Sequence, residues 1–406
     1  MQDLIQRPVY LEKLAAQKDK DLIKVVTGIR RCGKSVLLMQ LYTAWLIEHG
    51  VPRDRIIQVD LELRENAPLR DADALYRHVV ERLPEDGPSY VMIDEVQYVD
   101  GFADVLNGLN RRGCDVYVTG SNSKLLSSDI ETAMRGRSIG IRVWPLSFAE
   151  YHAHARGDVR ADYNDYLLFG GLPYVTAYDT REEKTAYLKM LEETVVLSDI
   201  VERHGVRNVA AFHAVYDFLC SNVGSLVSAN SIAKALRGSG FSTMTPDTVG
   251  AYLDHLTDAF LFSKAVRYDV KGKAYLQTLH KYYIADVGLR NAHMNYRQVE
   301  PTHLLENIVY LELVRRGLTV DIGKNRQKEI DFVATGERDT YYIQVAYSLA
   351  DPDKRAAELA SFAGLDDGYK KIVITMDDDP FTLLERGYRK LHVYDFLLDQ
   401  DSLQAV

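Results

Sequence analysis

The sequence predicts an α/β fold in which a parallel sheet comes first and a second α/β domain comes last. Short apolar runs alternate with helical patterns through residues 22–143, which is the order of successive β-α units. A glycine-containing loop joins the first predicted strand to a helix, and a later strand ends in two adjacent carboxylates. We therefore expect residues 22–143 to form a parallel sheet that helices cover.

The composition is that of an ordinary globular chain with an acidic balance. Its 406 residues allow about two to four domains. The formal charge of −9 argues against a general nucleic-acid coat but leaves room for a local basic patch. The three cysteines are scattered without a CxxC pair, so neither a disulfide framework nor a zinc site is indicated. We find no signal peptide and no membrane-spanning apolar run, and we expect a cytoplasmic protein without a membrane partner.

Residues 28–35 (GIRRCGKS) match the pattern G-x-x-x-x-G-K-[ST] between an apolar strand at 22–26 and a helical pattern at 34–49. Glycines let backbone N–H groups curl around phosphate oxygens, and the helix N-terminus adds partial positive charge. Lys34 is expected to reach the β- and γ-phosphates, and the Ser35 hydroxyl is expected to ligate Mg²⁺. The simpler alternative is a glycine turn before an ordinary helix. The pattern favours a P-loop that binds ATP or ADP.

The predicted nucleotide-contacting residues extend over the whole loop and one later strand. They are Gly28, Ile29, Arg30, Arg31, Cys32, Gly33, Lys34, Ser35, Val36 and Ser121. Arg30 and Arg31 fill variable positions of the pattern, where solvated side chains are the alternative. Cys32 is interpreted as a small loop residue rather than a redox group.

The run at residues 90–95 (YVMIDE) is an apolar strand that ends in Asp94 and Glu95. Asp94 can hold Mg²⁺ through a bound water near Ser35, and Glu95 can polarise the water that attacks the γ-phosphate. An apolar strand ending in Asp-Glu is often only structural. Its position after a P-loop favours the catalytic interpretation.

Two further segments carry candidate phosphate contacts. The predicted strand at 116–122 runs into Thr119, Ser121 and Asn122, which either sense the γ-phosphate or form a polar turn. The predicted helix at 130–137 ends in Arg137, which could stabilise transition-state charge on its own γ-phosphate or on a neighbour's. A solvated helix end is the alternative for Arg137. A strand at 139–143 is expected to close the sheet.

Beyond residue 144 the sequence predicts helices, then a hairpin, then a second α/β domain. Three helices near 209–220, 228–236 and 245–260 precede strands at 263–268 and 273–279, which is the winged-helix order. The third helix presents acidic rather than basic side chains, so a protein-contacting or structural role is favoured for the helices. DNA remains a candidate partner through the basic hairpin at 264–273. Its cations are Lys264, Arg267, Lys271 and Lys273.

The last part of the chain has the layout of metal-dependent nucleases. An acidic residue on a first helix, Asp on a strand and acid-x-Lys on the next strand define that layout. Glu306 and Asp331 occupy the first two positions, but Gln344 and Ala346 stand in the third. Nuclease activity is therefore not expected. Glu306 and Asp331 either bind a metal or serve as hydrogen-bonding groups in a small core.

Several motifs together resemble one family, that of bacterial and archaeal AAA-type P-loop ATPases of the ASCE class joined to a C-terminal domain of unknown function. Besides the P-loop, they are RPVYL (7–11), IDEVQ (93–97), TGSN (119–122), GR (136–137), PLSF (145–148), GGLP (170–173), KYYIADVGL (281–289), LEN (305–307) and EIDF (329–332). The resemblance implies ATP at residues 28–35, Mg²⁺ at Ser35 and Asp94, Glu95 as catalytic base and Arg137 near the phosphates. It also implies four domains. These are an AAA-type ATPase domain (1–144), a helical lid or linker (145–205), a winged-helix-like segment (206–296) and a PD-(D/E)xK nuclease-like domain (297–406).

The expected function is that of a Mg²⁺-dependent ATPase with Lys34, Glu95 and Arg137 as catalytic residues. Its nucleotide state is expected to move the C-terminal modules. Two alternatives stay open. One is an ATP-dependent DNA-binding or nuclease-like protein, and the other is a nucleotide-gated switch that binds a protein partner or a second copy of the chain.

Overall fold

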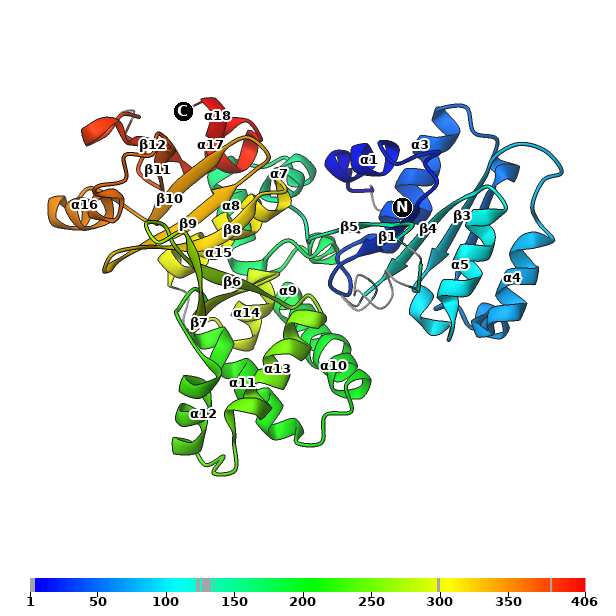
Figure 1. The fold of residues 1–406 in the computed structure, drawn as a ribbon, viewed down its shortest axis with the longest axis horizontal. Helices are drawn as coiled ribbons and strands as arrows, with labels where there is room; N and C mark the ends of the chain where they lie inside the picture. Colours follow the sequence, from blue (N-terminus) through cyan, green and yellow to red (C-terminus); the bar gives the residue numbers. More distant parts are fainter. Residues whose placement is uncertain are drawn as a thin grey trace. The chain divides into compact units, whose positions relative to one another are not determined.

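Figure 1 shows the computed structural model, which describes residues 4–121, 125, 133–134, 136–297, 300–379 and 382–405. The chain divides into two compact units. Unit 1 comprises Met1–Pro145, Leu172–Ala177 and Asp258–Phe260. Unit 2 comprises Leu146–Gly171, Tyr178–Thr257 and Leu261–Val406.

Unit 1 contains a five-stranded parallel sheet in the order β2-β3-β4-β1-β5. The strands are β1 Ile23–Thr27, β2 Ile56–Asp60, β3 Ser89–Asp94, β4 Cys114–Gly120 and β5 Ser138–Arg142. Strand β4 pairs with both β1 and β3, so it lies between the strand that precedes the P-loop and the strand that ends in Asp94. All carboxyl ends therefore lie at one edge of the sheet, and the P-loop and both carboxylates follow directly from that edge.

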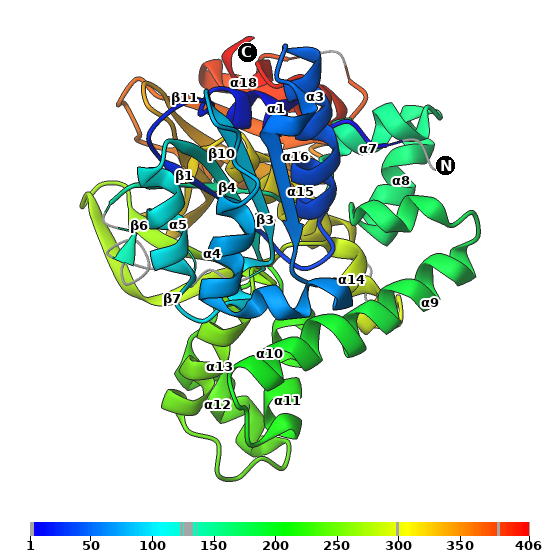
Figure 2. The same cartoon turned by 90° about the vertical axis from the view of Figure 1, so that its right-hand side faces the viewer.

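Helices cover both faces of this sheet. They include α1 Pro8–Ala15, α4 Ala72–Val80, α5 Phe102–Arg111 and a continuous helical run made of α2 Lys34–Val36, the π-helix η1 Leu37–Tyr42 and α3 Thr43–Glu48. Figure 2 shows α4 and α5 side by side over one face, where Leu75 and Leu106 join the core with Val25 and Ile93 of the strands. On the other face, the Tyr42 hydroxyl lies 2.7 Å from that of Tyr117 in β4. The predicted α/β fold with a P-loop NTPase sheet is thus confirmed.

Half of the residues of the predicted helix at 130–137 lie outside the described part of the chain. Short 3₁₀ turns complete unit 1. The turns are η2 Arg53–Arg55, η3 Arg64–Arg70, η4 Val96–Tyr98 and η6 Pro173–Ala177.

Unit 2 contains a seven-stranded mixed sheet in the order β12-β11-β10-β9-β8-β6-β7. The strands are β6 Phe262–Asp269, β7 Ala274–Ile284, β8 Thr319–Asn325, β9 Lys328–Thr335, β10 Thr340–Ala346, β11 Lys370–Thr375 and β12 Arg389–His392. Strand β6 pairs in parallel with β8, so the hairpin expected as a wing belongs to the same sheet as the C-terminal strands. The boundary expected after residue 296 therefore falls within one sheet.

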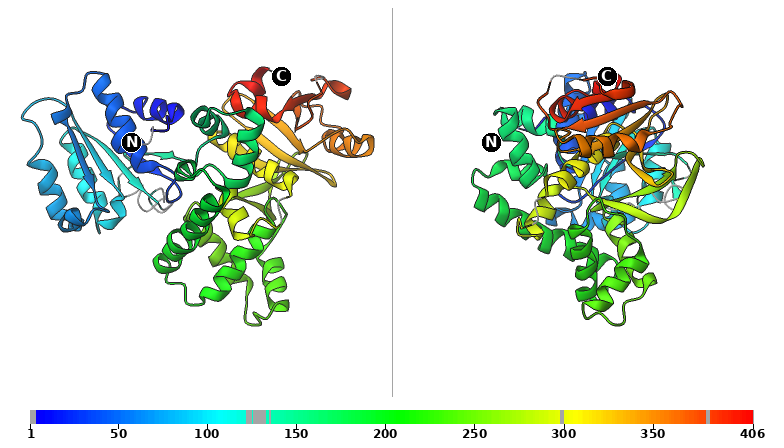
Figure 3. Two further views of the ribbon diagram at one scale, coloured as in Figure 1. Left: turned by 180° about the vertical axis from the view of Figure 1, so that it is seen from behind. Right: turned by 90° about the vertical axis from the view of Figure 1, so that its left-hand side faces the viewer.

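Figure 3 shows the helices of unit 2 from behind. They are α7 Phe148–Ala155, α8 Val159–Phe169, α9 Arg181–Leu191, η7 Glu192–Leu197, α10 Ser198–Arg203, α11 Val209–Ser221, α12 Ala229–Gly238, α13 Pro246–Asp258, α14 Val287–His293, α15 Pro301–Arg315, α16 Pro352–Leu359, η8 Ala360–Phe362, η9 Glu385–Gly387, α17 Val393–Leu398 and α18 Ser402–Ala405. A capping box between Ser147 and Glu150 starts α7. Among the described residues, no helix combines the length and the hydropathy that a membrane span requires.

Candidate active site

The loop between β1 and α2 depends on two glycines. A Cβ on Gly28 would stand 2.1 Å from the carbonyl oxygen of Val143, so any side chain there would clash with the backbone. Gly33 caps α2 with φ 97° and ψ 17°, a left-handed conformation that favours glycine. These two constraints curl residues 28–33 into the compact loop that the motif predicts.

Lys34 directs its ammonium back into this loop. The Lys34 side chain is buried, and its Nζ donates to the carbonyl oxygens of Gly28 at 3.1 Å and Ile29 at 3.2 Å. The same Nζ lies 3.8 Å from Oε1 of Glu95. The ammonium therefore stands between the loop and the carboxylate that follows β3.

Thr119 of β4 joins the two predicted acidic residues. Its hydroxyl donates to Oδ1 of Asp94 and accepts the backbone N–H of Glu95 at 2.9 Å. Glu95 adopts a left-handed backbone conformation with φ 52°, which turns the chain sharply after β3. The Thr119 hydroxyl thereby fixes the orientation of both carboxylate residues.

The Glu95 carboxylate is buried and accepts hydrogen bonds from one hydroxyl group and one side-chain amide. Ser121 donates to Oε2 of Glu95 at 3.3 Å, and the Gln97 amide donates to the same oxygen. Gln97 is a contact that the sequence analysis assigned no role. Its position two residues after Glu95, within the IDEVQ motif, is the only signal that could have indicated it.

The electrostatic environment of Asp94 is unusual for a carboxyl group. Burial raises its pKa to about 6, and the neighbouring Glu95 and Asp60 carboxylates act in the same direction. Hydrogen bonds from Thr119 and Ser35 oppose this rise. A cation beside Asp94 would favour the ionised form, so the site gains from binding one.

The residues present fit a Mg²⁺ ion bound together with phosphates. Mg²⁺ prefers oxygen ligands and usually takes only one or two from the protein when phosphates supply others. The Ser35 hydroxyl and the Asp94 carboxylate, which hydrogen bond to each other, provide that small set. In the described part of the chain, no group of three or more His, Cys, Asp or Glu residues forms a complete metal site.

The remaining loop residues divide into buried and exposed positions. Ile29 and Cys32 are buried, Arg30, Ser35 and Val36 are half-buried, and Arg31 is exposed with φ 65°. The Cys32 thiol lies 3.5 Å from the Val143 carbonyl oxygen, and burial raises its pKa. A thiol with a raised pKa is a poor nucleophile, which agrees with a packing role.

Arg137 lies at the opposite end of the sheet from the P-loop of its own chain. Its carbonyl oxygen accepts the N–H of Ile23, the first residue of β1, whereas the P-loop follows Thr27, the last. Five strand residues span about 13 Å, which is longer than an arginine side chain. Contact between the exposed Arg137 and the γ-phosphate of its own chain is therefore excluded. Asn122, a further predicted candidate, lies outside the described residues.

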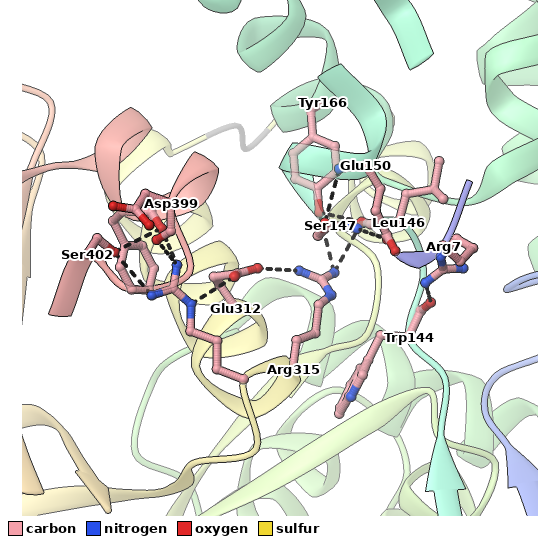
Figure 4. A network of polar contacts seen from close by, with 12 residues as sticks. Arg7, Trp144, Leu146, Ser147, Glu150, Tyr166, Glu312, Arg315, Asp399 and Ser402 are labelled. Atoms are coloured by element: carbon pink, nitrogen blue, oxygen red, sulfur yellow. Dashed lines mark hydrogen bonds and ion pairs between the residues drawn. The ribbon is translucent and has the colours of Figure 1, made fainter. Parts of the chain in front are cut away.

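Arg7 is a contact of the P-loop to which the sequence analysis gave no role. Its buried guanidinium donates to the carbonyl oxygens of Cys32 at 3.2 Å and Trp144 at 2.8 Å, as Figure 4 shows for Trp144. The guanidinium also lies over the ring of Tyr10, whose hydroxyl accepts the N–H of Trp144 at 3.1 Å. The Arg7 side chain thus connects the P-loop to Trp144, at the point where the chain leaves the sheet after β5. Only its place in the RPVYL motif could have indicated it.

A second group of charged residues lies in unit 2. The structure brings together Glu306 of α15 and Asp331 of β9, and it adds Lys281 of β7, which the sequence analysis did not connect with them. Nζ of Lys281 lies 2.9 Å from Glu306 and 2.8 Å from Glu329. The Tyr283 hydroxyl donates to the same Glu306 oxygen at 2.6 Å. The nuclease layout expects a lysine on the strand that corresponds to β10, and β10 has none. Lys281 on β7 instead places an ammonium beside Glu306.

Asp331 and the neighbouring Gln344 form further hydrogen bonds in this group. Oδ2 of Asp331 accepts the Val345 N–H at 2.8 Å, while Gln344 accepts the Asp331 N–H at 3.3 Å and donates to Glu358 at 2.7 Å. Burial raises the pKa of Asp331 well above its usual range, and Glu306 adds to this rise while Lys281 opposes it. The Lys281 ammonium supplies the positive charge here, so the residues fit an internal ion-pair network better than a metal centre.

Comparisons with known proteins agree with the fold and the P-loop. An AAA domain family matches residues 20–152, and a domain of unknown function (DUF8612) matches residues 160–300. An uncharacterised protein of Haemophilus influenzae is 38% identical over 403 residues, covering 97% of this chain and 99% of the relative. An uncharacterised protein of Methanocaldococcus jannaschii is 29% identical over 382 residues, covering 88% and 83%. The Aeropyrum pernix Orc1 protein in complex with DNA is 14% identical and covers 73% of this chain and 94% of that one, but its TM-score of 0.29 supports no conclusion.

Proposed function

This chain belongs to the same family as the Haemophilus influenzae relative and matches an AAA domain over residues 20–152, and on this premise we propose that it hydrolyses ATP to ADP and phosphate with Mg²⁺. One observation carries the proposal. Lys34, Ser35, Asp94 and Glu95 converge from two loops at the carboxyl edge of the unit 1 sheet, and Nζ of Lys34 stands 3.8 Å from the Glu95 carboxylate. This is the residue set that phosphoryl transfer to water requires.

Each of these residues has a distinct role in the proposed reaction. The backbone N–H groups of residues 28–33 and the Lys34 ammonium bind the β- and γ-phosphates. Ser35 and Asp94 would hold Mg²⁺, which supplies positive charge against the phosphate oxygens. Glu95 accepts a proton from the attacking water while Ser121 holds its carboxylate in place.

The segment around Pro145 supports the proposal that nucleotide binding rearranges the C-terminal modules. In unit 1, Arg7 holds the Trp144 carbonyl and the P-loop carbonyl of Cys32. In unit 2, the Leu146 carbonyl accepts from the Tyr166 hydroxyl at 2.9 Å and from Arg315 at 3.3 Å (Figure 4). Pro145 therefore joins two anchored carbonyl groups, and a shift of the P-loop would pull on one of them.

A second passage of the chain between the units also contacts the loop. The segment Leu172–Ala177 belongs to unit 1, and Cγ of Pro173 lies 3.5 Å from the position that a Cβ on Gly33 would take. Directly before this segment, in unit 2, the Gly171 N–H donates to Asp286 at 2.7 Å. The GGLP motif thus has one end at the P-loop and the other end fixed by a buried carboxylate, which supports the same coupling.

The position of Arg137 supports an assembly of several copies. Because Arg137 cannot reach the γ-phosphate of its own chain, the predicted role for it requires the nucleotide of a neighbouring copy. We include this homo-oligomer in the proposal.

Calorimetry and phosphate release together test the proposed function. The wild type should bind Mg-ATP and Mg-ADP, and Lys34→Ala should abolish binding. Glu95→Gln should keep binding but release phosphate at least about 100-fold more slowly, because the general base is lost. Glu81→Gln, an exposed position at the end of α4, serves as the matched control. Absence of a binding heat in the wild type, or normal phosphate release from Glu95→Gln, would refute the proposal.

A further inference from the structure

Cations that lack an acidic partner concentrate in one region of unit 2, although the chain as a whole has a formal charge of −9. Lys271 and Lys273 lie in the turn between β6 and β7 and are exposed. Lys324, Arg326 and Lys328 lie at the end of β8, in the next turn and at the start of β9. Within the described residues, none of these five side chains forms an ion pair.

The two turns lie side by side because β6 and β8 are paired in parallel and end together. Asp269 of β6 is the register partner of Lys324, and the N–H of Val270 donates to the Lys324 carbonyl oxygen at 3.0 Å. The Asp269 carboxylate accepts the backbone N–H groups of Lys271 and Gly272. The acidic residue closest in sequence is thus engaged in shaping the turn rather than in neutralising its lysines.

A cavity of about 410 Å³ continues this positive region. Gly364 lines the cavity, and Nζ of Lys271 lies 3.4 Å from the position of a Cβ on that glycine. Arg386 and Arg389 also line it and form no ion pair within the described part of the chain. Lys271 therefore connects the two turns to the cavity. We call the resulting surface the basic strip, which consists of Lys271, Lys273, Lys324, Arg326, Lys328, Arg386 and Arg389.

Three other charged residues line the cavity, two lysines and one aspartate. Lys371 pairs with Asp367 at 3.1 Å, and Lys370 donates to carbonyl oxygens at the end of α18, so both are already satisfied. Asp366 is the acidic side chain on the cavity wall without an ion pair among the described residues. Seven cations without an ion pair in the described part of the chain, against the carboxylates of Asp366 and Asp269, make a field that attracts a polyanion.

We propose that the basic strip binds the phosphate backbone of a single-stranded nucleic acid. Cations spread over two turns and a cavity match a chain of phosphates better than one isolated phosphate. Tyr369 lines the cavity and is 46% exposed, and Tyr275 on β7 is 61% exposed, so both rings offer faces on which unpaired bases stack. The third helix of the expected winged-helix segment is acidic, and the binding surface therefore lies on the sheet turns instead.

Fluorescence anisotropy with a labelled 30-nucleotide oligothymidine tests the proposal on the full chain without nucleotide. The wild type should bind at 50 mM salt, and log affinity should fall linearly as log salt rises. Lys271→Ala/Arg326→Ala/Lys328→Ala should weaken binding at least about tenfold and reduce the salt slope by about 2, because three phosphate contacts are lost. Binding is measured without ATP, so failure here is distinguishable from failure of the proposed ATPase function.

A matched control removes three exposed cations elsewhere in unit 2. Arg207→Ala/Lys234→Ala/Arg338→Ala removes the same charge, and its Lys234 lies on α12, within the helices of the expected winged-helix segment. This variant should bind like the wild type. The proposal is overturned if the wild type does not bind, if the control loses as much affinity as the strip variant, or if duplex DNA of equal length binds more tightly than the single strand. Unchanged melting temperatures establish that both variants are folded.

Discussion

The ammonium of Lys34 lies 3.8 Å from Oε1 of Glu95, so the P-loop and the end of β3 meet at a single pair of charges. Both side chains are buried, and Lys34 also donates to two loop carbonyl groups. A triphosphate would offer the ammonium a more highly charged partner than these carbonyl groups. The same cation can therefore turn towards phosphate without leaving the site, and the neighbours of Glu95 decide how well the base is held.

Replacing Thr119 with valine should disturb both carboxylate residues at once. The change keeps the side-chain shape but leaves the buried Glu95 N–H without its acceptor and removes a donor from Asp94. We expect a loss of about 1–3 kcal/mol in the free energy of unfolding and slower phosphate release. Thr119→Ser keeps the hydroxyl and should retain most of both properties. Equal urea unfolding curves for Thr119→Val and the wild type would contradict this assignment.

Removing the Arg7 guanidinium should weaken the P-loop from a distance. Arg7→Ala leaves the Cys32 and Trp144 carbonyl groups without their donor, and we expect a loss of about 2–4 kcal/mol in stability. Mg-ATP affinity should fall at least about tenfold because the loop is no longer held. Glu12→Ala, an exposed position on the helix α1 that follows Arg7, serves as control in both the unfolding and the calorimetric titrations. A variant that melts early yet binds Mg-ATP normally would limit Arg7 to a structural role.

Mixing two inactive variants should reveal whether Arg137 acts on a neighbouring copy. Arg137→Ala should release phosphate slowly while binding Mg-ATP normally, because the residue lies far from its own P-loop. An equimolar mixture with Glu95→Gln should recover part of the wild-type rate, since some interfaces then combine an intact Glu95 with an intact Arg137. The rate of the mixture is compared with the sum of the separate rates. If it does not exceed that sum, action between copies is rejected.

Replacing Lys281 should destabilise unit 2 strongly. Burial alone would lower the pKa of this lysine, but the carboxylates of Glu306, Asp331 and Glu329 raise it overall. Lys281→Met leaves the buried Glu306 and Asp331 and the half-buried Glu329 without their cation, and we expect a loss of about 3–5 kcal/mol at pH 7. Adding Glu306→Gln removes one of the stranded charges and should restore part of the loss. Denaturant titration of both variants measures this, and additive losses would contradict the ion-pair network.

The stability of unit 2 should depend on pH through His293. Burial would lower its pKa, but ion pairs with Asp217 at 2.7 Å and Glu192 at 2.8 Å raise it from 6.5 to about 9. Since the folded pKa is the higher one, the stabilisation is complete below pH 6.5 and is lost as the pH rises through about 9. The exposed Asp217 is screened by solvent, so we expect about 1–2 kcal/mol.

Urea titrations of the wild type and His293→Gln at pH 6 and pH 9.5 measure this effect. The wild type should be the more stable protein at pH 6, and the difference should shrink at pH 9.5. His154→Gln on α7 serves as the control and should show no such change. A difference between wild type and His293→Gln that is the same at both pH values would exclude a role of the histidine charge.

Most of the predictions for unit 1 came from local sequence patterns. Each strand is a short apolar run, and Gly28, Gly33 and Lys34 stand at fixed spacings because the loop geometry requires them in one continuous stretch. Asp94 and Glu95 directly follow such a run, so their position at the carboxyl edge needed only the assumption of a parallel sheet. The strands, the P-loop and the two carboxylates are all specified by residues that lie close together in the sequence.

The sequence alone thus determined the α/β fold, the P-loop and the place of the two carboxylates, because residues close along the chain specify them. Only the tertiary structure decided that Arg7 holds the P-loop, that Lys281 faces Glu306, and that Arg137 lies at the far end of its own sheet. It also decided that β6 pairs with β8, which places two basic turns side by side. These relationships depend on contacts between distant segments, and no periodicity or spacing encodes which strand or helix a side chain will meet.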